Sequence, residues 1–476
     1  MSEQSSGALY ARLLSYVRPY ARVFGIAVVG IVAAAATEPL FPALIKPLLD
    51  AGFGAKAPST PPLLFAGAIV GIFLARGILT FTSSYFMNWV SSRVVLDLRA
   101  AMFDRLLRLP TRFYDDHTSG SLLSKVAYDV TNVSSAATVA LTVLVRDSIA
   151  VIGLFAWLFY LNWKLTLIAV LIAPPIGLTV RLIAARLRRM ARGAQRSTGD
   201  LVQVLQETIE CHKVVKVFGG EAYEAQRFLK TAQTLRGFLM RGQIAAALTT
   251  PITHVLAATA VAVIVYIAMQ DTIGTRATVG EFASFMTAML MLLAPIKHLT
   301  ELNPIIQRGL AAAESVFGLI DTPAEEDRGR IAIGRARGEV AFENVAFTYP
   351  TRVEPALAGI DLRVRPGETL ALAGPSGGGK TTLVNLLPRF YSPSAGRIVL
   401  DGHDIQALTL ESLRANIALV SQEVVLFNDS IFANIAYGRM AGASEKEVIA
   451  AAEAAHAMGF IRETPEGLNT LIGENG

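Results

Sequence analysis

Six long apolar stretches constrain the fold of this chain more than any other feature. A helix needs roughly 20 mostly apolar residues to cross the hydrocarbon core of a bilayer, and each stretch is long enough to do so. The stretches are residues 22–49, 62–86, 137–161, 164–184, 243–270 and 279–300. Composition agrees, because 53% of the residues are hydrophobic and only 17% are charged, compared with about a quarter charged in a soluble domain. We therefore expect a polytopic α-helical membrane domain with six spans.

The charges in the connections orient these spans. Residues 87–136 and 185–242 form long connections rich in Arg and Lys, whereas the connections at 50–61, 162–163 and 271–278 are short and carry few charges. Basic loops remain in the cytoplasm, so an even number of spans places both termini there as well. The formal net charge of +5 is then explained by membrane topology and contact with membrane lipids, and we expect no nucleic-acid partner.

The basic connections also carry structural signals. Residues 90–110 keep a helical periodicity, so we expect the spans to continue as long cytoplasmic helices. Reversals are expected at 113–120 and 217–224, either as contacts with a cytosolic domain or as simple polar turns. Residues 8–18 alternate apolar and basic faces, as an interfacial helix does.

Three cations interrupt the apolar stretches: Arg76, Arg146 and Lys297. A charge at mid-bilayer costs about 2.5–3.5 kcal/mol, so each cation should face a partner or a wet cavity. All three lie roughly 20–27 Å below the outer end of their span, and this shared depth favours an anionic headgroup that enters from the cytoplasm. Alternatively, Arg76 or Lys297 snorkels, or Arg146 pairs with a carboxylate such as Glu38. Asp147 should point about 100° away from Arg146 around the helix and serve another contact.

The pattern changes after the last span. Residues 321–338 are charged and broken by Pro and Gly, as in a linker. Short β-branched or alternating segments then indicate strands at 339–349, 360–365 and 369–374. The predicted organisation is a membrane domain with cytoplasmic helical extensions at 1–320, a linker at 321–338 and a partial α/β P-loop nucleotide-binding domain at 339–476.

The third expected strand leads into a glycine-rich loop that fits G-x-x-x-x-G-K-[ST]. Its glycines permit unusual dihedral angles, so backbone N–H groups can converge on phosphate oxygens, and the following helix adds its dipole. Lys380 should reach the β- and γ-phosphates, and the Thr381 hydroxyl should hold Mg²⁺. The nucleotide-binding residues expected here are Gly374, Pro375, Ser376, Gly377, Gly378, Gly379, Lys380, Thr381 and Thr382.

Two further residues are candidates for the same site. Tyr349 could stack on a base or pack against the sheet. Gln422 ends an expected strand, where a polar side chain can contact Mg²⁺ or water. Residues 444–447 form a capping box that should start a helix.

These features together resemble the ABC exporters of the half-transporter type, with the type IV exporter fold, over essentially the whole chain. The segments that carry the resemblance are the six spans, Tyr349, GPSGGGKTT, Gln422 and LFNDSIFANIAYG. The membrane half is most similar to the lipid A exporters (MsbA type) of Gram-negative inner membranes. The resemblance implies a homodimer that uses ATP and Mg²⁺ to move lipid A–core, a lipopolysaccharide precursor, from the inner to the outer leaflet.

The resemblance also implies residue roles. Tyr349 would stack on adenine, Gln422 would contact Mg²⁺, and the two reversals would be coupling helices. The headgroup cavity would be lined by Arg76, Arg146 and Lys297. Ala294 stands where some relatives have another arginine, so we expect a less basic cavity.

The family pattern continues beyond the residues printed here. Relatives proceed into a signature loop, a Walker B strand with its Asp and Glu, and a switch His, and residues 423–476 contain no apolar strand that ends in Asp-Glu. We therefore expect the printed chain to bind ATP without hydrolysing it, with no complete catalytic set.

Two alternatives remain open at this point. A multidrug or peptide exporter could use the same scaffold, although lipophilic cations would prefer acidic or aromatic walls to a basic layer. A truncated, nucleotide-binding membrane interaction partner is the non-enzymatic alternative, although it would expose a sheet edge and apolar core surface.

Overall fold

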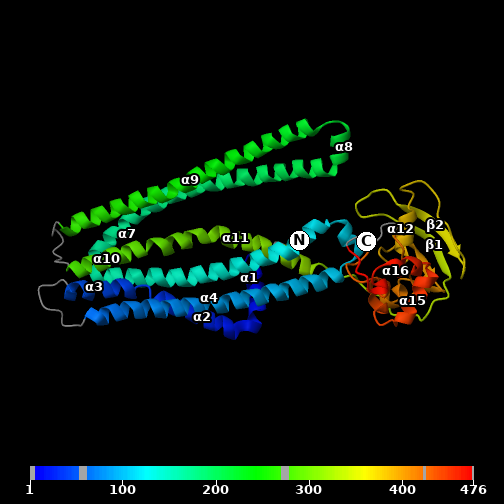
Figure 1. The fold of residues 1–476 in the computed structure, drawn as a ribbon, viewed down its shortest axis with the longest axis horizontal. Coiled ribbons are helices and arrows are strands. Elements are labelled where there is room, and N and C mark those ends of the chain that lie inside the picture. Colours follow the sequence, from blue (N-terminus) through cyan, green and yellow to red (C-terminus); the bar gives the residue numbers. More distant parts are fainter. Residues whose placement is uncertain (1–5, 53–61, 270–277, 422–424, 474–476) are drawn as a thin grey trace. The chain divides into compact units, whose positions relative to one another are not determined.

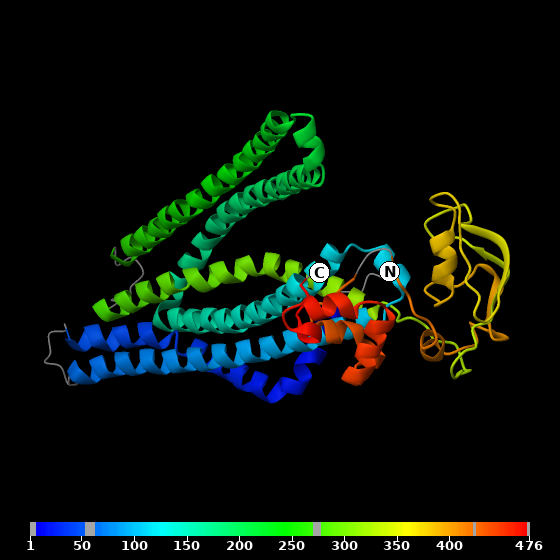
Figure 2. The same ribbon diagram turned by 45° about the vertical axis from the view of Figure 1, so that its right-hand side comes forward.

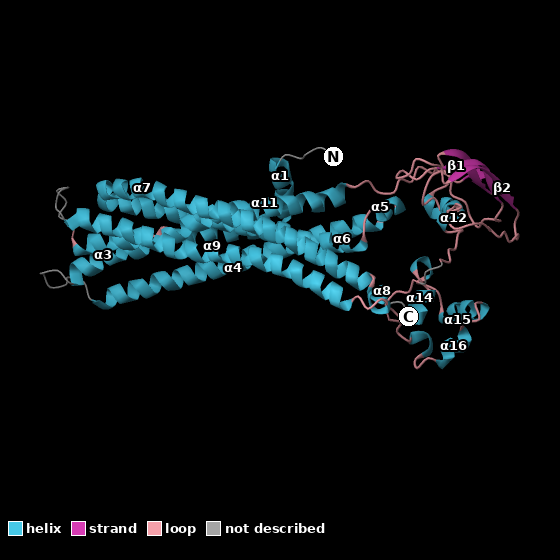
Figure 3. Ribbon diagram, turned by 90° about the horizontal axis from the view of Figure 1, so that it is seen from above, coloured by secondary structure: helices cyan, strands magenta, loops and turns pink. Residues whose placement is uncertain are grey.

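The computed structural model describes residues 6–52, 62–269, 278–421 and 425–473. These residues form two units, which we describe separately. The first unit comprises Met1–Leu109 and His117–Ala324, and the second comprises Pro110–Asp116 and Glu325–Gly476. The first unit is helical, and the described strands all belong to the second (Figure 3). The expected division into a helical domain followed by a domain of strands and helices is therefore confirmed.

The first unit begins with three helices in place of one straight span. Helix α1 covers Ser6–Val17 and corresponds to the expected interfacial helix. The first expected span is divided into α2, Ala21–Ala36, and α3, Leu40–Gly52. The break precedes Pro39, because proline has no N–H for a helical hydrogen bond and disfavours helical geometry in the residue before it.

Helix α4 runs without a break from Pro62 to Leu107, so the expected helical continuation of the second span is confirmed. Two short helices follow, α5 at Thr111–Asp115 and α6 at Ser119–Ser124. A π-helical turn at Lys125–Asp129 then leads into α7.

Helix α7 runs from Val130 to Glu210 as two arms that meet at Asn162. The backbone of Asn162 is extended, and its Oδ1 accepts hydrogen bonds from the N–H groups of Lys164 and Leu165, each at 3.1 Å. This is how an N-cap side chain starts a helix, so the second arm begins here. The outer connection expected at 162–163 is one capped turn.

Helix α8, His212–Val217, joins the second arm of α7 to α9, Glu221–Met269, and the two long helices run side by side (Figures 1 and 2). Gly219 adopts φ +63°, a conformation that glycine takes without steric cost, at the reversal. The chain therefore turns within the expected segment 217–224.

The last helices of the unit are α10, Val279–Met291, and α11, Leu293–Asp321. Thr278 and Glu281 form a capping box at the start of α10. Asp50 of α3 accepts two further hydrogen bonds there, from the Thr278 hydroxyl and the Gly280 N–H, both at 2.9 Å. A Cβ at Gly280 would lie 2.3 Å from the carbonyl oxygen of Lys46, so glycine allows α3 and α10 to pack closely.

Four helical segments in the described part of the chain are long and apolar enough to cross a membrane. They are Gly7–Asp50, Leu63–Leu107, Ser119–Leu171 and Val279–Asp321. The expected fourth and fifth spans are helical in α7 and α9 as far as Met269, and a total of six spans remains a prediction.

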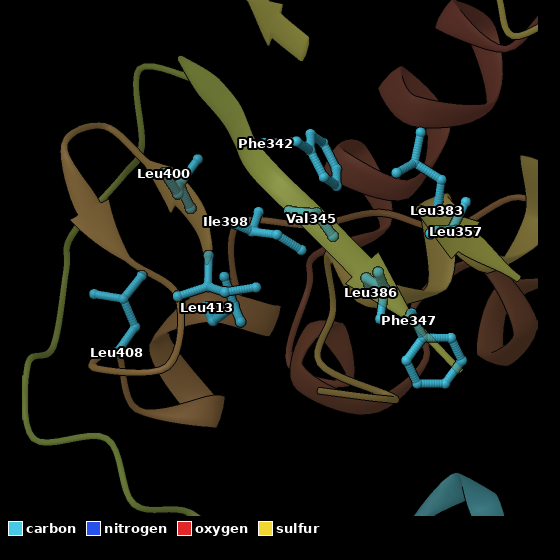
Figure 4. Packing of buried hydrophobic residues seen from close by; sticks show 11 residues of the cluster. Phe342, Val345, Phe347, Leu357, Leu383, Leu386, Ile398, Leu400, Leu408 and Leu413 are labelled. Atoms are coloured by element: carbon cyan, nitrogen blue, oxygen red, sulfur yellow. The ribbon is translucent and has the colours of Figure 1, made fainter. Parts of the chain in front are cut away.

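The second unit contains a four-stranded antiparallel sheet in the order β2-β1-β3-β4. The strands are β1 at Val340–Phe347, β2 at Leu357–Val364, β3 at Ala395–Leu400 and β4 at His403–Asp404. Figure 4 shows the apolar core between this sheet and α12, Lys380–Leu386, where Val345, Leu386 and Ile398 are fully buried. The remaining helices are α13 at Leu410–Arg414, α14 at Ile431–Ile435, α15 at Glu445–Ala454 and α16 at Met458–Glu463.

Two strand predictions were wrong. Residues 369–374 have no regular secondary structure, and neither have residues 417–421, the described part of the strand expected around Gln422. A strand is stable only when its backbone groups bond to a neighbouring strand, and no described strand pairs with either segment. Their apolar side chains are consequently exposed, as at Leu372 and Val420. The capping box expected at 444–447 is confirmed at the start of α15.

Residues 325–338, within the expected linker, are attached to the second unit. Glu325 accepts two hydrogen bonds from the Arg414 guanidinium, at 2.6 and 2.7 Å. Asp327 accepts one from the N–H of Leu410 at 2.9 Å. The segment therefore follows the surface of the domain instead of crossing to it as a free chain.

Candidate functional site

The glycine-rich loop takes the backbone shape that its sequence requires. Gly374, Gly377 and Gly379 have φ values of +153°, +79° and +82°. A Cβ at Gly379 would lie 2.7 Å from the carbonyl oxygen of Ala356, so both conformation and space demand glycine there. Residues 371–378 are exposed, so a ligand can approach the backbone of the loop.

Lys380 lies over this loop. Its Nζ donates hydrogen bonds to the carbonyl oxygens of Gly374 at 3.0 Å and Pro375 at 2.8 Å. The positive charge is therefore beside the backbone that would hold phosphates. Thr381, the expected Mg²⁺ ligand, has an exposed side chain, whereas Thr382 is buried. The residues present thus fit a Mg²⁺-nucleotide, because the Thr381 hydroxyl is accessible to Mg²⁺ and the Lys380 amine lies beside the loop that would hold the phosphates.

Tyr349 is tied to the helix that follows the loop. Its hydroxyl forms a hydrogen bond with Thr382 Oγ1 at 3.0 Å. The ring is half-buried, and its centroid lies 4.8 Å from that of Phe347 and 5.4 Å from that of Tyr391 in edge-to-face contacts. Tyr349 therefore packs against the sheet, as one of its two interpretations proposed, beside the phosphate loop. Gln422 lies outside the described residues.

The first expected reversal contacts the nucleotide-binding domain. Helix α5 belongs to the second unit, and Asp115 accepts a hydrogen bond from the hydroxyl of Tyr391. Burial, followed by the bond to Asp115, raises the pKa of Tyr391 above its ordinary value. Of the two interpretations, the structure supports contact with the cytosolic domain for this reversal.

Arg76 has a carboxylate partner. Its Nη2 lies 2.6 Å from Glu38 Oε1, and Glu38 stands in the turn between α2 and α3. The sequence allows Glu38 to pair with Arg146, but in the structure it pairs with Arg76. One-third of the Arg76 side chain remains exposed, so part of the guanidinium stays accessible.

Arg146 belongs to a second polar group that joins α7 to α11. Its Nε lies 2.8 Å from Asp147 Oδ1, so the long arginine side chain bends around the helix to its neighbour. Adjacent positions on a helix are about 100° apart, and the flexible Arg146 side chain spans this separation. Asp147 also serves another contact, because its Oδ2 lies 3.0 Å from Nδ1 of His298. Only 4% of the Asp147 side chain is exposed.

Lys297 precedes His298 in α11, and its side chain is exposed. No ion pair of Lys297 occurs within the described part of the chain. The structure therefore joins Arg146 to the helix that carries Lys297 through Asp147 and His298. Arg76 is not part of this group and pairs with Glu38.

Comparison with known proteins decides the family. The ABC transporter transmembrane region matches residues 24–296, and the ABC transporter domain matches residues 357–472. The chain belongs to the ABC transporter family. This transporter is similar to curated ATP-dependent lipid A-core flippases. Examples come from Dechloromonas aromatica (53% identity over 474 residues), Thiobacillus denitrificans (51% over 479) and Albidiferax ferrireducens (48% over 473). The alignments cover 99–100% of the transporter and 81–82% of these relatives.

Sequence reasoning missed several polar partners in the transporter. The sequence analysis did not identify His298 as a partner of Asp147. The signal was present, because a carboxylate beside Arg146 in an apolar helix indicates a buried polar cluster. Asp50 was missed because its two partners lie more than two hundred residues away along the chain. Such long-range capping leaves no local pattern in the sequence.

Proposed function

We propose that the transporter uses ATP to export lipid A–core across the bacterial inner membrane. The observation that carries this proposal is the cation set Arg76, Arg146 and Lys297 in a membrane domain joined to a phosphate-binding loop. The relatives that align along the whole chain are named ATP-dependent lipid A-core flippases, which agrees with both parts.

The nucleotide site would consist of the loop Gly374–Thr382, with Tyr349 at the adenine and Gln422 near the metal. Lys380 would bind the β- and γ-phosphates with the amine that now contacts the loop carbonyls. The exposed hydroxyl of Thr381 would supply one ligand to Mg²⁺, a hard cation that prefers oxygen. Bound Mg²⁺ would neutralise charge on the phosphates, and the protein would hold the phosphates in place.

The lipid site would bind phosphate groups through the three cations. Glu38 and Asp147 compensate the charges of Arg76 and Arg146, which would lie in the inner part of the membrane, where an unpaired charge is costly. An incoming phosphate would replace these carboxylates as partners or share the guanidinium with them. Two carboxylates thus lower the cost of holding the cations ready for an anionic lipid.

The transporter would work as a homodimer with both termini in the cytoplasm. The abundance of Arg and Lys in 87–136 and 185–242 supports this orientation. Cross-linking or native mass spectrometry of the purified protein tests the dimer. A protease-cleavable tag after Gly476 tests the orientation, because it should be protected from external protease in intact spheroplasts.

The charge reversal Arg76→Glu/Arg146→Glu tests the function. In the protein expressed from its complete coding sequence, this variant should lose most of the ATPase stimulation by lipid A. Two cations that bind phosphate are replaced by carboxylates, which repel phosphate. Lys164→Glu, near the outer turn at Asn162, is the control for a change of charge in the membrane domain and should retain stimulation. Equal stimulation of all three proteins would refute the proposed lipid site.

A further inference from the structure

A cavity with a mixed apolar and polar lining lies between α2, α4 and α7, on the cytoplasmic side of the cation set. Its volume is about 220 Å³, far more than the ~10–15 Å³ that one water molecule needs. Apolar walls come from Ile31 of α2, Met87 of α4, and Val139 and Val143 of α7. The polar walls include Ser84 and Asn88 of α4 and Thr142 of α7. The described residues that line the cavity are all uncharged.

Three side chains of this cavity have unused hydrogen-bonding capacity. The Thr138 hydroxyl donates to the carbonyl oxygen of Ser134 at 2.8 Å and is therefore occupied. Within the described part of the chain, the side chains of Ser84, Asn88 and Thr142 form no hydrogen bond. A hydroxyl offers one donor and two acceptor positions, and an amide offers two donors and an acceptor. Mixed donors and acceptors without a charge match neutral hydroxyl groups better than they match phosphate.

The position of the cavity along the helices relates it to the cation set. Counted at 1.5 Å per residue from Pro62, Arg76 lies roughly 21 Å along α4, whereas Ser84 and Asn88 lie roughly 33 and 39 Å along it. The hydrocarbon core is about 30 Å thick, so Ser84 and Asn88 lie at its inner edge, next to the headgroups. On α7, Thr142 precedes Arg146 by four residues and therefore lies on the same face, one turn nearer the cytoplasm.

We propose that this cavity binds neutral sugar hydroxyls of the lipid headgroup while the cations above it bind the phosphates. The inference rests on the proposed function and defines which part of the headgroup each region recognises. A lipid held by its phosphate at Arg146 places its more polar, sugar-bearing end toward the cytoplasm, where Thr142 and Asn88 offer hydrogen bonds. The cavity would thus select lipids that carry sugars beyond the phosphorylated disaccharide.

Trp89 provides a reporter beside the cavity, because it follows Asn88 directly. The chain contains three tryptophans, so Trp157→Phe/Trp163→Phe leaves Trp89 as the single fluorophore. The purified full chain with this background would be titrated with diphosphoryl lipid A and with rough-type lipopolysaccharide that carries core sugars. The variants are Thr142→Val, Asn88→Leu and the conservative Thr142→Ser, with Ser92→Ala on α4 as a matched control outside the cavity.

Thr142→Val and Asn88→Leu should each weaken binding of the core-bearing lipid about three- to tenfold, as expected for one neutral hydrogen bond. Lipid A affinity should change less than twofold, and Thr142→Ser and Ser92→Ala should bind both lipids normally. Equal losses for both lipids, or no loss, would overturn the cavity inference while leaving the proposed function intact if Arg146→Ala weakens both. Failure of the unsubstituted protein to bind either lipid would overturn both proposals.

Discussion

Arg12 of α1 is bonded to Asp321, the last residue of α11, by two hydrogen bonds of 2.5 and 2.6 Å. The Arg12 guanidinium also lies 4.3 Å from the centroid of the Phe317 ring, a cation–π distance. Helix α1 is therefore attached to the end of the helix that leads out of the first unit. A movement of α11 should therefore displace α1, and a movement of α1 should displace α11.

This ion pair predicts a measurable change in α1. Both side chains are partly exposed, so the pair contributes about 1 kcal/mol or less. Arg12→Glu should therefore increase hydrogen exchange of the α1 amides up to about fivefold, because local opening becomes easier. The swap Arg12→Glu/Asp321→Arg should restore protection. Unchanged exchange in the single variant would show that apolar packing alone holds α1.

Glu38 should compete with lipid for Arg76. Glu38→Gln removes the carboxylate that lies 2.6 Å from the guanidinium, so an anionic lipid should bind at least twofold more tightly. Equilibrium titration with diphosphoryl lipid A measures this affinity. The matched control is Glu281→Gln, which removes the carboxylate paired with Lys46 between α3 and α10. A fall in affinity on Glu38→Gln would mean that Glu38 positions Arg76 for the lipid instead of competing with it.

Two glycines of the phosphate loop should differ in their tolerance of alanine. Both have positive φ, but a Cβ at Gly379 meets the Ala356 carbonyl oxygen at 2.7 Å, whereas nothing lies within 4 Å of a Cβ at Gly377. Gly377→Ala should introduce only backbone strain of about 1 kcal/mol. Nucleotide affinity should therefore fall by at most about fivefold. Gly379→Ala should lose at least tenfold, because the backbone must move. Titration with a fluorescent ATP analogue measures both, and equal losses would contradict the steric argument.

Asp401 should make the attachment of residues 337–339 depend on pH. Burial of its carboxylate favours the neutral form, but hydrogen bonds from the N–H groups of Glu339, Arg337 and Gly338 outweigh this and lower its pKa. A lowered pKa stabilises the folded form above the unfolded value of about 3.9, and this contribution is lost as the pH falls through the folded pKa.

Asp401→Ala should therefore destabilise the second unit by about 1–2 kcal/mol at neutral pH. Calorimetry of the full chain should show a constant difference from the unsubstituted protein between about pH 5 and 8, and a smaller one below about pH 4. A difference that grows on acidification would contradict the sign of the argument.

Local patterns in the sequence were sufficient for much of the fold. The apolar length of α4, the capping box of α15 and the glycines before Lys380 each act within a few residues, so their structures could be predicted. The phosphate loop was recognisable for the same reason, because its chemistry depends on consecutive backbone groups.

Features that depend on distant residues could not be predicted in this way. Residues 369–374 have a strand-like pattern, but no described strand pairs with them, since pairing requires a neighbour that the local pattern does not specify. For a similar reason, the sequence did not specify which carboxylates pair with Arg76 and Arg146. Helical periodicity placed Asp147 on a different side from Arg146, but the flexible arginine side chain reaches it.

Lipid translocation tests the central claim most directly. The protein expressed from its complete coding sequence would be reconstituted into vesicles, and movement of lipid A–core between leaflets would be measured with and without Mg²⁺-ATP. The account predicts translocation that requires Mg²⁺-ATP, disappears in Lys380→Ala and falls strongly in Arg76→Glu/Arg146→Glu. Translocation that persists in Lys380→Ala, or ATP hydrolysis with no movement of lipid A–core, would contradict it.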